Sequence, residues 1–468
     1  MTATTSTRGT LLLLGGASLA LTLAALALHV PGADTVGTDL RHNLFVALLG
    51  VAAAVYLLAV GLVVRRPAAT GSVLVVLGVA IAMRLVVLIP QPFLSSDVYR
   101  YVWDGRVQVA GINPFRYMPA DPALQSLRDD AIYPNINRAD TARTIYPPAA
   151  QLVFQAVARI SPTVVAMKLA MVAFEALACW AMLRVLALAR LPGERVLIYA
   201  WNPGAVWAFA GNGHVDAIAI GLLAVAFLLR VQRRDTWVGV AFGAAVLVKF
   251  LPAAVAPALW RPPPWPPGWP WEWRHAAWRM PLVALATIVA LYALYGSVGW
   301  HVLGYLPGYF GEEDLSQGPG IWLLGWIALV QPVTPLMAEI YAAIVLACLA
   351  ALGAWIAFRP RPQLDTPQLD ARRICADAAI LAAALTVAIS PHYPWYFVWL
   401  ALPCCVFASW TIIWIAVAPV LLYINPFHDQ FIWPSVVYLP AAALLAREWW
   451  QSAARRSLAG IKATQGSS

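Results

Sequence analysis

Charged residues are scarce in this chain, and lysine is almost missing from it. Only 11% of its 468 residues are charged, whereas 61% are hydrophobic and the mean hydropathy is +0.72. Soluble domains usually have roughly 25% charged residues, so the composition excludes a soluble globular protein and predicts an integral membrane protein. The only lysines are Lys168, Lys249 and Lys462.

Cysteine is also too sparse to organise the fold. The five cysteines have neither the spacing of a metal site nor that of a disulfide framework, and most lie within apolar runs. We expect them to pack as small buried hydrophobic residues. No polar linker separates a second soluble domain, so we treat residues 1–468 as one membrane domain.

Apolar runs recur along the chain at a length that can cross about 30 Å of hydrocarbon. The first three are 11–28, 45–64 and 71–89, and further runs continue to Leu445. They predict an all-α, polytopic membrane bundle of about 12 to 14 membrane helices, some too short to span. The first run follows only Arg8 and lacks a small-residue cleavage site, so we expect a retained span with a cytoplasmic amino terminus.

Arginines in alternate connections predict the topology, because cytoplasmic loops collect positive charge. The net charge of +9 is therefore a topology signal, and we expect no nucleic-acid partner. The expected location is the inner (plasma) membrane, with both termini in the cytoplasm. Expected inside are Arg65, Arg66, Arg190, Arg195, Arg230, Arg233, Arg234, the Pro/Trp-rich loop 261–279, residues 359–373 and the tail 448–468; expected outside are Asp34, Asp39, 91–147, the acidic loop 297–318 and Asp429.

The predicted outer loop 91–147 is rich in aromatic residues and interrupted by prolines. This pattern indicates short interfacial helices lying on the membrane. The pair Pro147-Pro148 then opens an amphipathic stretch, which predicts an interfacial helix over 148–162. A pocket between these outer helices and the bundle would have aromatic walls and a polar floor, which suits a sugar on a lipid carrier.

Residues 95–106 of this loop place two carboxylates and two guanidiniums directly after an apolar run. Charge beside a membrane is costly and often functional. We expect a short helix with Ser96 as its N-cap, which puts Asp97 and Arg100 on one face and Asp104 one turn further along. In the alternative, Asp97 caps the helix or pairs with a loop arginine. For Asp104 with Arg106, a structural ion pair is the favoured interpretation.

Several short motifs resemble a known family. Ser95-Ser-Asp97-Val-Tyr99-Arg-Tyr101, followed by Gly111-Ile-Asn-Pro-Phe115 and Thr144-Ile-Tyr-Pro-Pro148, resembles the GT-C superfamily of membrane glycosyltransferases. Within it, the chain looks like the bacterial polyprenyl-phosphate-mannose-dependent mannosyltransferases, including glycosyltransferase family 87 and its relatives. Three later segments are similar to the same pattern: 212–216, 243–252 and 390–396.

The resemblance implies transfer of a hexose, here expected to be mannose, from a polyprenyl-phosphate carrier to a glycolipid or polysaccharide acceptor on the outer face. Such a transfer needs a base for the acceptor hydroxyl, and Asp97 is the candidate. If it acts alone at the reaction centre, the anomeric configuration inverts, so a β-linked donor gives an α product. The candidate phosphate ligands are Arg100, Lys249 and His392, ahead of Arg106; the candidate sugar- or acceptor-binding residues are Tyr99, Tyr101, Tyr146, His214, Asp216 and Tyr396.

Some of these residues have structural alternatives. His214 and Asp216 are equally consistent with a hydrogen-bonded helix junction, and His392 with an interfacial anchor. Lys249 faces the phosphate only if 237–248 and 251–260 form a hairpin of two short helices, which loop charge favours over a single span. The run Glu312 to Asp314 suggests a solvated acidic face more than a divalent-cation site, so no metal or cofactor is expected.

The main rival function is a transporter or flippase of lipid-linked sugars. It also needs charge within the membrane and aromatic walls, but it predicts charges spread along a path through the spans. Here most charges gather toward one face. A non-catalytic membrane scaffold leaves the cluster around Asp97 without a purpose.

Overall fold

The computed structural model describes residues 2–29, 38–66, 71–260, 278–305, 320–359, 366–424 and 432–465. All regular secondary structure within these ranges is helical, and they contain no strand. The expected all-α fold is therefore confirmed. Most of the Pro/Trp-rich loop, the run Glu312 to Asp314, Asp34 and Asp429 lie outside the described residues.

The helices alternate between long continuous elements and short broken ones. The long ones are α1 (Thr2–Ala27), α2 (Thr38–Arg65), α3 (Ser72–Leu88), α6 (Val164–Leu188), α9 (Asp216–Val231), α12 (Arg279–Ala293), α15 (Pro335–Phe358), α16 (Pro367–Ile389) and α19 (Ser435–Gln465). The shorter ones are α4 (Asp97–Val109), α5 (Pro148–Ile160), α7 (Leu197–Ala200), α8 (Pro203–Ala205), α10 (Asp235–Val246), α11 (Ala256–Leu259), α14 (Trp322–Ala328), α17 (Ala401–Cys404) and α18 (Trp410–Val417).

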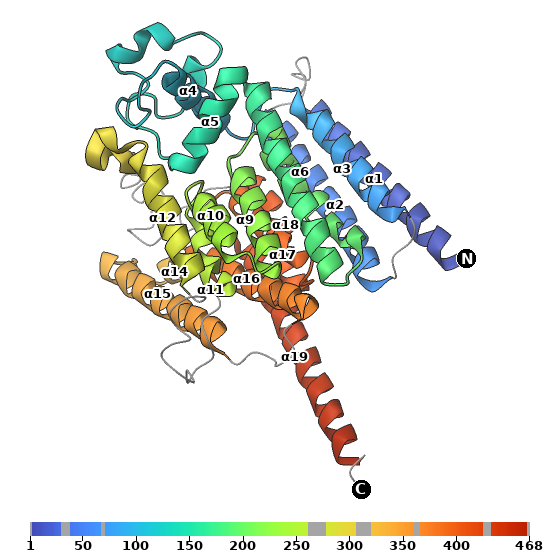
Figure 1. The fold of residues 1–468 in the computed structure, drawn as a ribbon. Coiled ribbons are helices and arrows are strands. Elements are labelled where there is room, and N and C mark those ends of the chain that lie inside the picture. The colour runs from blue at the N-terminus through green and yellow to red at the C-terminus, as the bar shows by residue number, and fades with distance from the viewer. Residues whose placement is uncertain are drawn as a thin grey trace.

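Short 3-10 or π helices connect several of these elements. They are η1 (Pro122–Leu127), η2 (Tyr133–Asn135), η3 (Gly193–Val196), η4 (Val206–Gly211), η5 (Leu251–Val255), η6 (Gly296–Leu303), η7 (Pro394–Leu400) and η8 (Ala418–Ile424). Figure 1 shows α4 and α5 together at one end of the bundle, while the carboxyl-terminal part of α19 extends from the opposite end.

The first three expected spans form α1, α2 and α3, and α1 packs against both α2 and α3. Among the described residues, four helices are long and apolar enough to cross a membrane, or six if two bent pairs each count as one span. The bends are 118° between η4 and α9 and 111° between α12 and η6. The expected count of 12 to 14 membrane helices is not confirmed, because proline and glycine divide several apolar runs into short pieces.

The expected hairpin around Lys249 is present. Helix α10 ends at Val246, and η5 and α11 carry the chain back toward the other end of the bundle. The Trp260 ring then lies 5.3 Å from the Trp278 ring and 5.6 Å from the Phe358 ring, measured between centroids. Lys249 therefore lies at a turn, at the same end as α4.

Arginines from several connections meet at the opposite end, which we call the arginine end. Arg372 donates to the Ala189 carbonyl at 3.4 Å, and Arg233 lies 3.9 Å from Asp370. Arg359 pairs with Asp377. These contacts join connections that the loop charges assigned to one side of the membrane. Which side this end faces stays a prediction.

Inside the bundle, Arg84 of α3 and Glu175 of α6 form a buried bidentate ion pair. The Arg84 Nε to Glu175 Oε2 distance is 3.1 Å, and the Arg84 Nη2 to Glu175 Oε1 distance is 2.6 Å. Arg84 also donates to the carbonyls of Ala80 and Ala200. The pair therefore joins α3, α6 and α7, with its charges compensated.

Removing one partner should destabilise the bundle more than removing both. Glu175→Ala leaves the Arg84 guanidinium buried without its carboxylate, at a cost of about 3 to 5 kcal/mol. We expect a clearly lower Tm in detergent for this variant and substantial recovery in the Arg84→Met/Glu175→Met double variant. Equal Tm values for wild type and Glu175→Ala would contradict this role.

Candidate active site

A cavity of about 590 Å³ opens at the end of the bundle where α4 begins. We call it the Asp97 pocket. Its walls come from distant parts of the chain, namely the residues before and within the first turn of α4, 137–147, 214–216, 248–251, Tyr305 and 389–396. The pocket expected between the outer loop and the bundle is therefore present.

Asp97 is the first residue of α4, and its carboxylate faces the pocket. The expected N-cap bond from the Ser96 side chain is absent; instead Ser95 Oγ accepts from the Asp97 backbone N–H at 3.2 Å. Asp97 Oδ1 accepts from Asn137 Nδ2 at 2.8 Å, and Oδ2 lies 3.7 Å from His214 Nδ1. The side chain is 23% exposed and forms no ion pair with an arginine of the described chain. Its oxygens face the pocket rather than the helix amides.

Burial raises the pKa of the Asp97 carboxyl above the ordinary aspartate value. The hydrogen bond from Asn137 and the positive charges of Lys249 and Arg138 act in the opposite direction, and the negative charge of Asp216 reinforces burial. Burial has the largest effect, so the carboxyl holds its proton more strongly than an exposed aspartate does. This suits a group that must accept a proton.

Lys249 and Asp216 form an ion pair on the pocket wall. The Lys249 Nζ to Asp216 Oδ1 distance is 2.7 Å, and Nζ lies 3.3 Å from the centroid of the Tyr396 ring. Asp216 is the first residue of α9, where the helix dipole favours a negative charge. Much of the Lys249 charge is therefore compensated before any ligand binds.

Stacked rings form the aromatic wall. His214 stacks on Trp395 with 3.8 Å between ring centroids, and Trp395 stacks on Tyr393 at 4.5 Å. Trp395 is 7% exposed, so protein covers most of its ring. His392 lies beside this stack, with Nε2 2.9 Å from the Gly320 carbonyl oxygen. Tyr393 and Tyr396 are only half-buried, so their rings form the part of this wall that a ligand can contact.

Most of the predicted site residues line the pocket. Tyr99 does not, because its exposed hydroxyl donates to Gln91 Oε1 at 3.1 Å instead. The predicted residues that line it are Asp97, Arg100, Tyr101, Tyr146, His214, Asp216, Lys249, His392 and Tyr396; the lining residues that were not predicted include Asn137, Arg138, Arg143, Tyr305, Tyr393 and Trp395.

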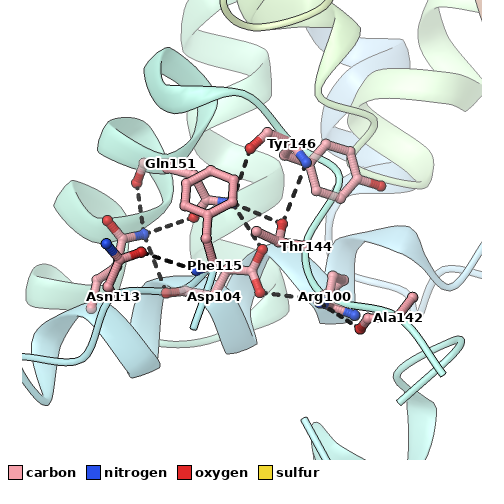
Figure 2. Close-up of polar contacts among 9 residues, drawn as sticks. Arg100, Asp104, Asn113, Phe115, Ala142, Thr144, Tyr146 and Gln151 are labelled. Atoms are coloured by element: carbon pink, nitrogen blue, oxygen red, sulfur yellow. Dashed lines mark hydrogen bonds and ion pairs between the residues drawn. The ribbon is translucent and has the colours of Figure 1, made fainter. Parts of the chain in front are cut away.

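Arg100 lines the pocket, but its guanidinium is engaged in a buried polar network (Figure 2). Its Nε donates to Asp104 Oδ1 at 3.0 Å, and its Nη2 donates to the Ala142 carbonyl at 3.2 Å. Gln151 of α5 donates to Asp104 Oδ2 and to Thr144 Oγ1, each at 2.9 Å. The network holds 142–146, the stretch of pocket wall that carries Arg143 and Tyr146, against α4 and α5.

The expected ion pair between Asp104 and Arg106 is wrong. Asp104 lies four positions after Arg100, which places them on one helix face, whereas Arg106 points elsewhere. Arg106 pairs with Asp129 and donates to the Pro162 carbonyl at 3.0 Å. Both charges are structural as expected, but with other partners, and Arg106 does not line the pocket.

Asp104→Ala should destabilise the protein more than Asp129→Ala. The first change leaves Arg100 and Gln151 buried with lost partners, whereas the Asp129 side chain is 39% exposed. An unsatisfied buried polar group costs about 1 to 3 kcal/mol, and exposed ion pairs are worth about 0 to 1 kcal/mol. Thermal unfolding of both variants in detergent compares them, and an equal loss would contradict the central role of Asp104.

No group of three or more His, Cys, Asp or Glu side chains in the described ranges is arranged to hold a metal ion. The acidic run Glu312 to Asp314 lies outside those ranges. The described lining of the Asp97 pocket offers the Asp97 carboxylate, the Lys249–Asp216 pair, neighbouring arginines and aromatic faces.

The described helices form an all-helical membrane fold with a carboxylate in a polar, aromatic-walled pocket at one end, and such a pocket suits a ligand that carries sugar rings. The profile of one family, described as alpha-(1→6)-mannopyranosyltransferase, N-terminal domain, matches residues 5–261, which is more than half of the chain. The chain belongs to this family and is a membrane glycosyltransferase of the mannosyltransferase type. Comparison with the curated proteins and with the solved structures found no match.

Proposed function

We propose that the protein transfers mannose from a polyprenyl-phosphate carrier to a hydroxyl of a glycolipid or polysaccharide on the outer face of the membrane. The observation that carries this proposal is the Asp97 carboxylate, which belongs to the family-matched region and faces a pocket of about 590 Å³. A mannosyl unit and part of an acceptor sugar are of a size to occupy such a pocket.

Asp97 acts as the general base. It takes the proton of the acceptor hydroxyl while the acceptor oxygen bonds to the anomeric carbon and the bond from that carbon to the phosphate oxygen breaks. The electron pair of the broken bond stays on the phosphate. A phosphate leaves readily as an anion, so the site needs cations rather than the second carboxylic acid of a glycoside hydrolase.

Lys249 and His392 remain proposed phosphate ligands, and the geometry adds Arg143 and Arg138. Arg100 is a weaker candidate than it was from sequence, because Asp104 and the Ala142 carbonyl already occupy its guanidinium. Arg143 lines the pocket, where its Nε donates to the Arg116 carbonyl at 3.2 Å, and it forms no ion pair within the described chain. Its charge is therefore available to an anion.

The family description supports an α-(1→6) product. An α linkage follows from a β-linked donor if a single inverting displacement occurs, and one carboxylate at the reaction centre supports that mechanism. The (1→6) linkage in turn suggests a hexose 6-hydroxyl as the acceptor. Tyr393 and Tyr396 offer the aromatic faces on which the sugar rings would stack.

Asp97→Asn should abolish most of the transfer. Asparagine keeps the shape but cannot take the proton, and loss of a general base costs about 10²- to 10⁴-fold in rate. The assay supplies purified protein in liposomes with radiolabelled polyprenyl-phosphate mannose and a membrane lipid extract, and it measures labelled product.

Asp140→Asn is the matched control, because Asp140 is an exposed aspartate of the same loop outside the pocket. We expect it to retain wild-type activity. Equal transfer by wild type and Asp97→Asn would exclude the base assignment. Movement of the labelled lipid across the liposome membrane without any transfer would instead support the rival function, a transporter of lipid-linked sugars.

Arg143→Gln should weaken donor binding. A hydrogen bond to a charged group is worth about 1.5 to 3 kcal/mol, so the KM for the donor should rise roughly 10- to 100-fold. Arg116→Gln, a change at an exposed arginine outside the pocket, serves as the control and should leave KM unchanged. A fall in kcat with an unchanged donor KM would argue against phosphate binding by Arg143.

A further inference from the structure

We infer that Asn137 and His214 are positioning residues that hold the Asp97 carboxylate between them, one at each oxygen. This inference rests on the proposed function, in which Asp97 is the base, and it changes the role of His214 from sugar binding to support of the base. Asn137 had no role from sequence. The two residues come from different parts of the chain, the loop before α5 and the turn before α9.

The Asn137 side of this arrangement is a direct hydrogen bond of 2.8 Å from Nδ2 to Asp97 Oδ1. The next residue, Arg138, has a φ of 51°, in the left-handed region that non-glycine residues seldom adopt. Its carbonyl accepts from the amides of Thr141 and Ala142, which closes a tight turn. Backbone strain of this kind persists only where surrounding contacts impose it, and it is common at functional sites.

The His214 side is held by a rigid turn. Asn212 Oδ1 accepts from the amides of Phe93 and Leu94, at 3.1 and 2.8 Å, which ties the turn to the segment leading into α4. Gly213 has a φ of 74°, and a Cβ at this position would lie 2.7 Å from Val98 Cγ2. Only glycine allows this approach, so the turn presses His214 toward the first turn of α4.

The burial of His214 argues against a sugar contact. The residue is 1% exposed, one face of its ring is covered by Trp395, and both ring nitrogens are buried. Neither nitrogen has a hydrogen-bond partner in the described chain, although Nδ1 faces Asp97 Oδ2 at 3.7 Å. Buried polar groups without partners are rare and call for an explanation. Catalytic hydrogen bonds are often long without substrate and shorten when it binds, which explains this separation.

Two neutral donors on one carboxylate would fix its orientation, since the terminal side-chain torsion of aspartate otherwise takes a broad range of angles. They would also stabilise the ionised form that accepts the proton. The protons of Asn137 and His214 stay in place during the reaction, and only the acceptor proton moves to Asp97. The other ionisable groups that face Asp97 are Lys249, Arg138, Asp216, Tyr101 and Tyr146.

The test measures the pH dependence of kcat/KM for Asn137→Ala and His214→Phe. Each change removes a donor to the ionised carboxylate, so the acidic limb should move to higher pH in both variants, and kcat should fall roughly two- to tenfold. Phenylalanine keeps a ring to stack on Trp395. Asn135→Ala is the control, because the side-chain amide of Asn135 donates only to the Ala131 carbonyl within the described chain. This variant should leave the acidic limb unmoved.

The outcome separates positioning from substrate binding. A raised acceptor KM with an unmoved acidic limb in His214→Phe would make His214 a sugar ligand and overturn its assignment, and an unmoved limb in Asn137→Ala would overturn that of Asn137. If His214→Phe does not fold, His214→Leu, which also lacks a donor, replaces it.

A second measurement needs no activity. Infrared titration of the carboxyl band, taken as the difference between wild type and Asp97→Asn, should show the Asp97 pKa rising in Asn137→Ala and His214→Phe. If the wild type transfers no mannose, the proposed function fails, but this titration still decides whether the two residues hold the carboxylate. An unchanged Asp97 pKa in both variants would exclude the proposed support of the carboxylate by Asn137 and His214.

Discussion

The structure depends on the cost of burying an unpaired charge in an apolar bundle. Several charges that the described helices carry inward meet a partner there. Glu175 meets Arg84 and Asp104 meets Arg100, while the buried Lys168 donates to the carbonyls of Val87 and Pro90. Breaking such a pair leaves a charge that neither lipid nor a packed helix can solvate. The remaining charges therefore gather at the two ends of the bundle, at the arginine end and around the Asp97 pocket.

The same constraint decides where helices can break. A break exposes backbone N–H and C=O groups, which need partners at membrane depth. At the sharp bend before α9, Asn212 donates to the Trp207 carbonyl of η4, and its side-chain oxygen accepts from the backbone amides of Phe93 and Leu94, which lie before α4. Asn202 does the same before α8, where it accepts from the Gly204 amide and donates to the Ala416 carbonyl. The break before α9 places His214 and Asp216 at the pocket.

The sequence was most informative where a pattern is local or where charge in the membrane is costly. Apolar runs predicted the first three helices, and the charges of the loops predicted the hairpin that places Lys249 at the pocket. Asp97 was selected as a candidate because it belongs to a cluster of charged residues that directly follows an apolar run. The count of 12 to 14 membrane helices was not confirmed, because length and hydropathy do not show that an apolar run is divided into 3-10 and π segments.

Residues that act through a fold-dependent contact were harder to predict. Asn137 lies in an irregular loop with no periodic pattern, and only the folded chain brings it 2.8 Å from a carboxylate forty positions earlier. Arg143 was one of six loop arginines, and sequence does not show which of them lack a carboxylate partner. The pairing of Arg100 with Asp104 was within reach, because a spacing of four residues on a helix favours it over Arg106.

The pocket needs both halves of the chain. The family-matched region supplies Asp97, Asn137, His214 and Lys249, but the ring that covers His214 is Trp395, which lies beyond that region. Lys249 likewise lies over the ring of Tyr396. Without the stack from 393–396, the imidazole would be free to rotate and open to water, and the Lys249 charge would lose an aromatic contact. The second half of the chain therefore fixes the surroundings of the base that the first half provides.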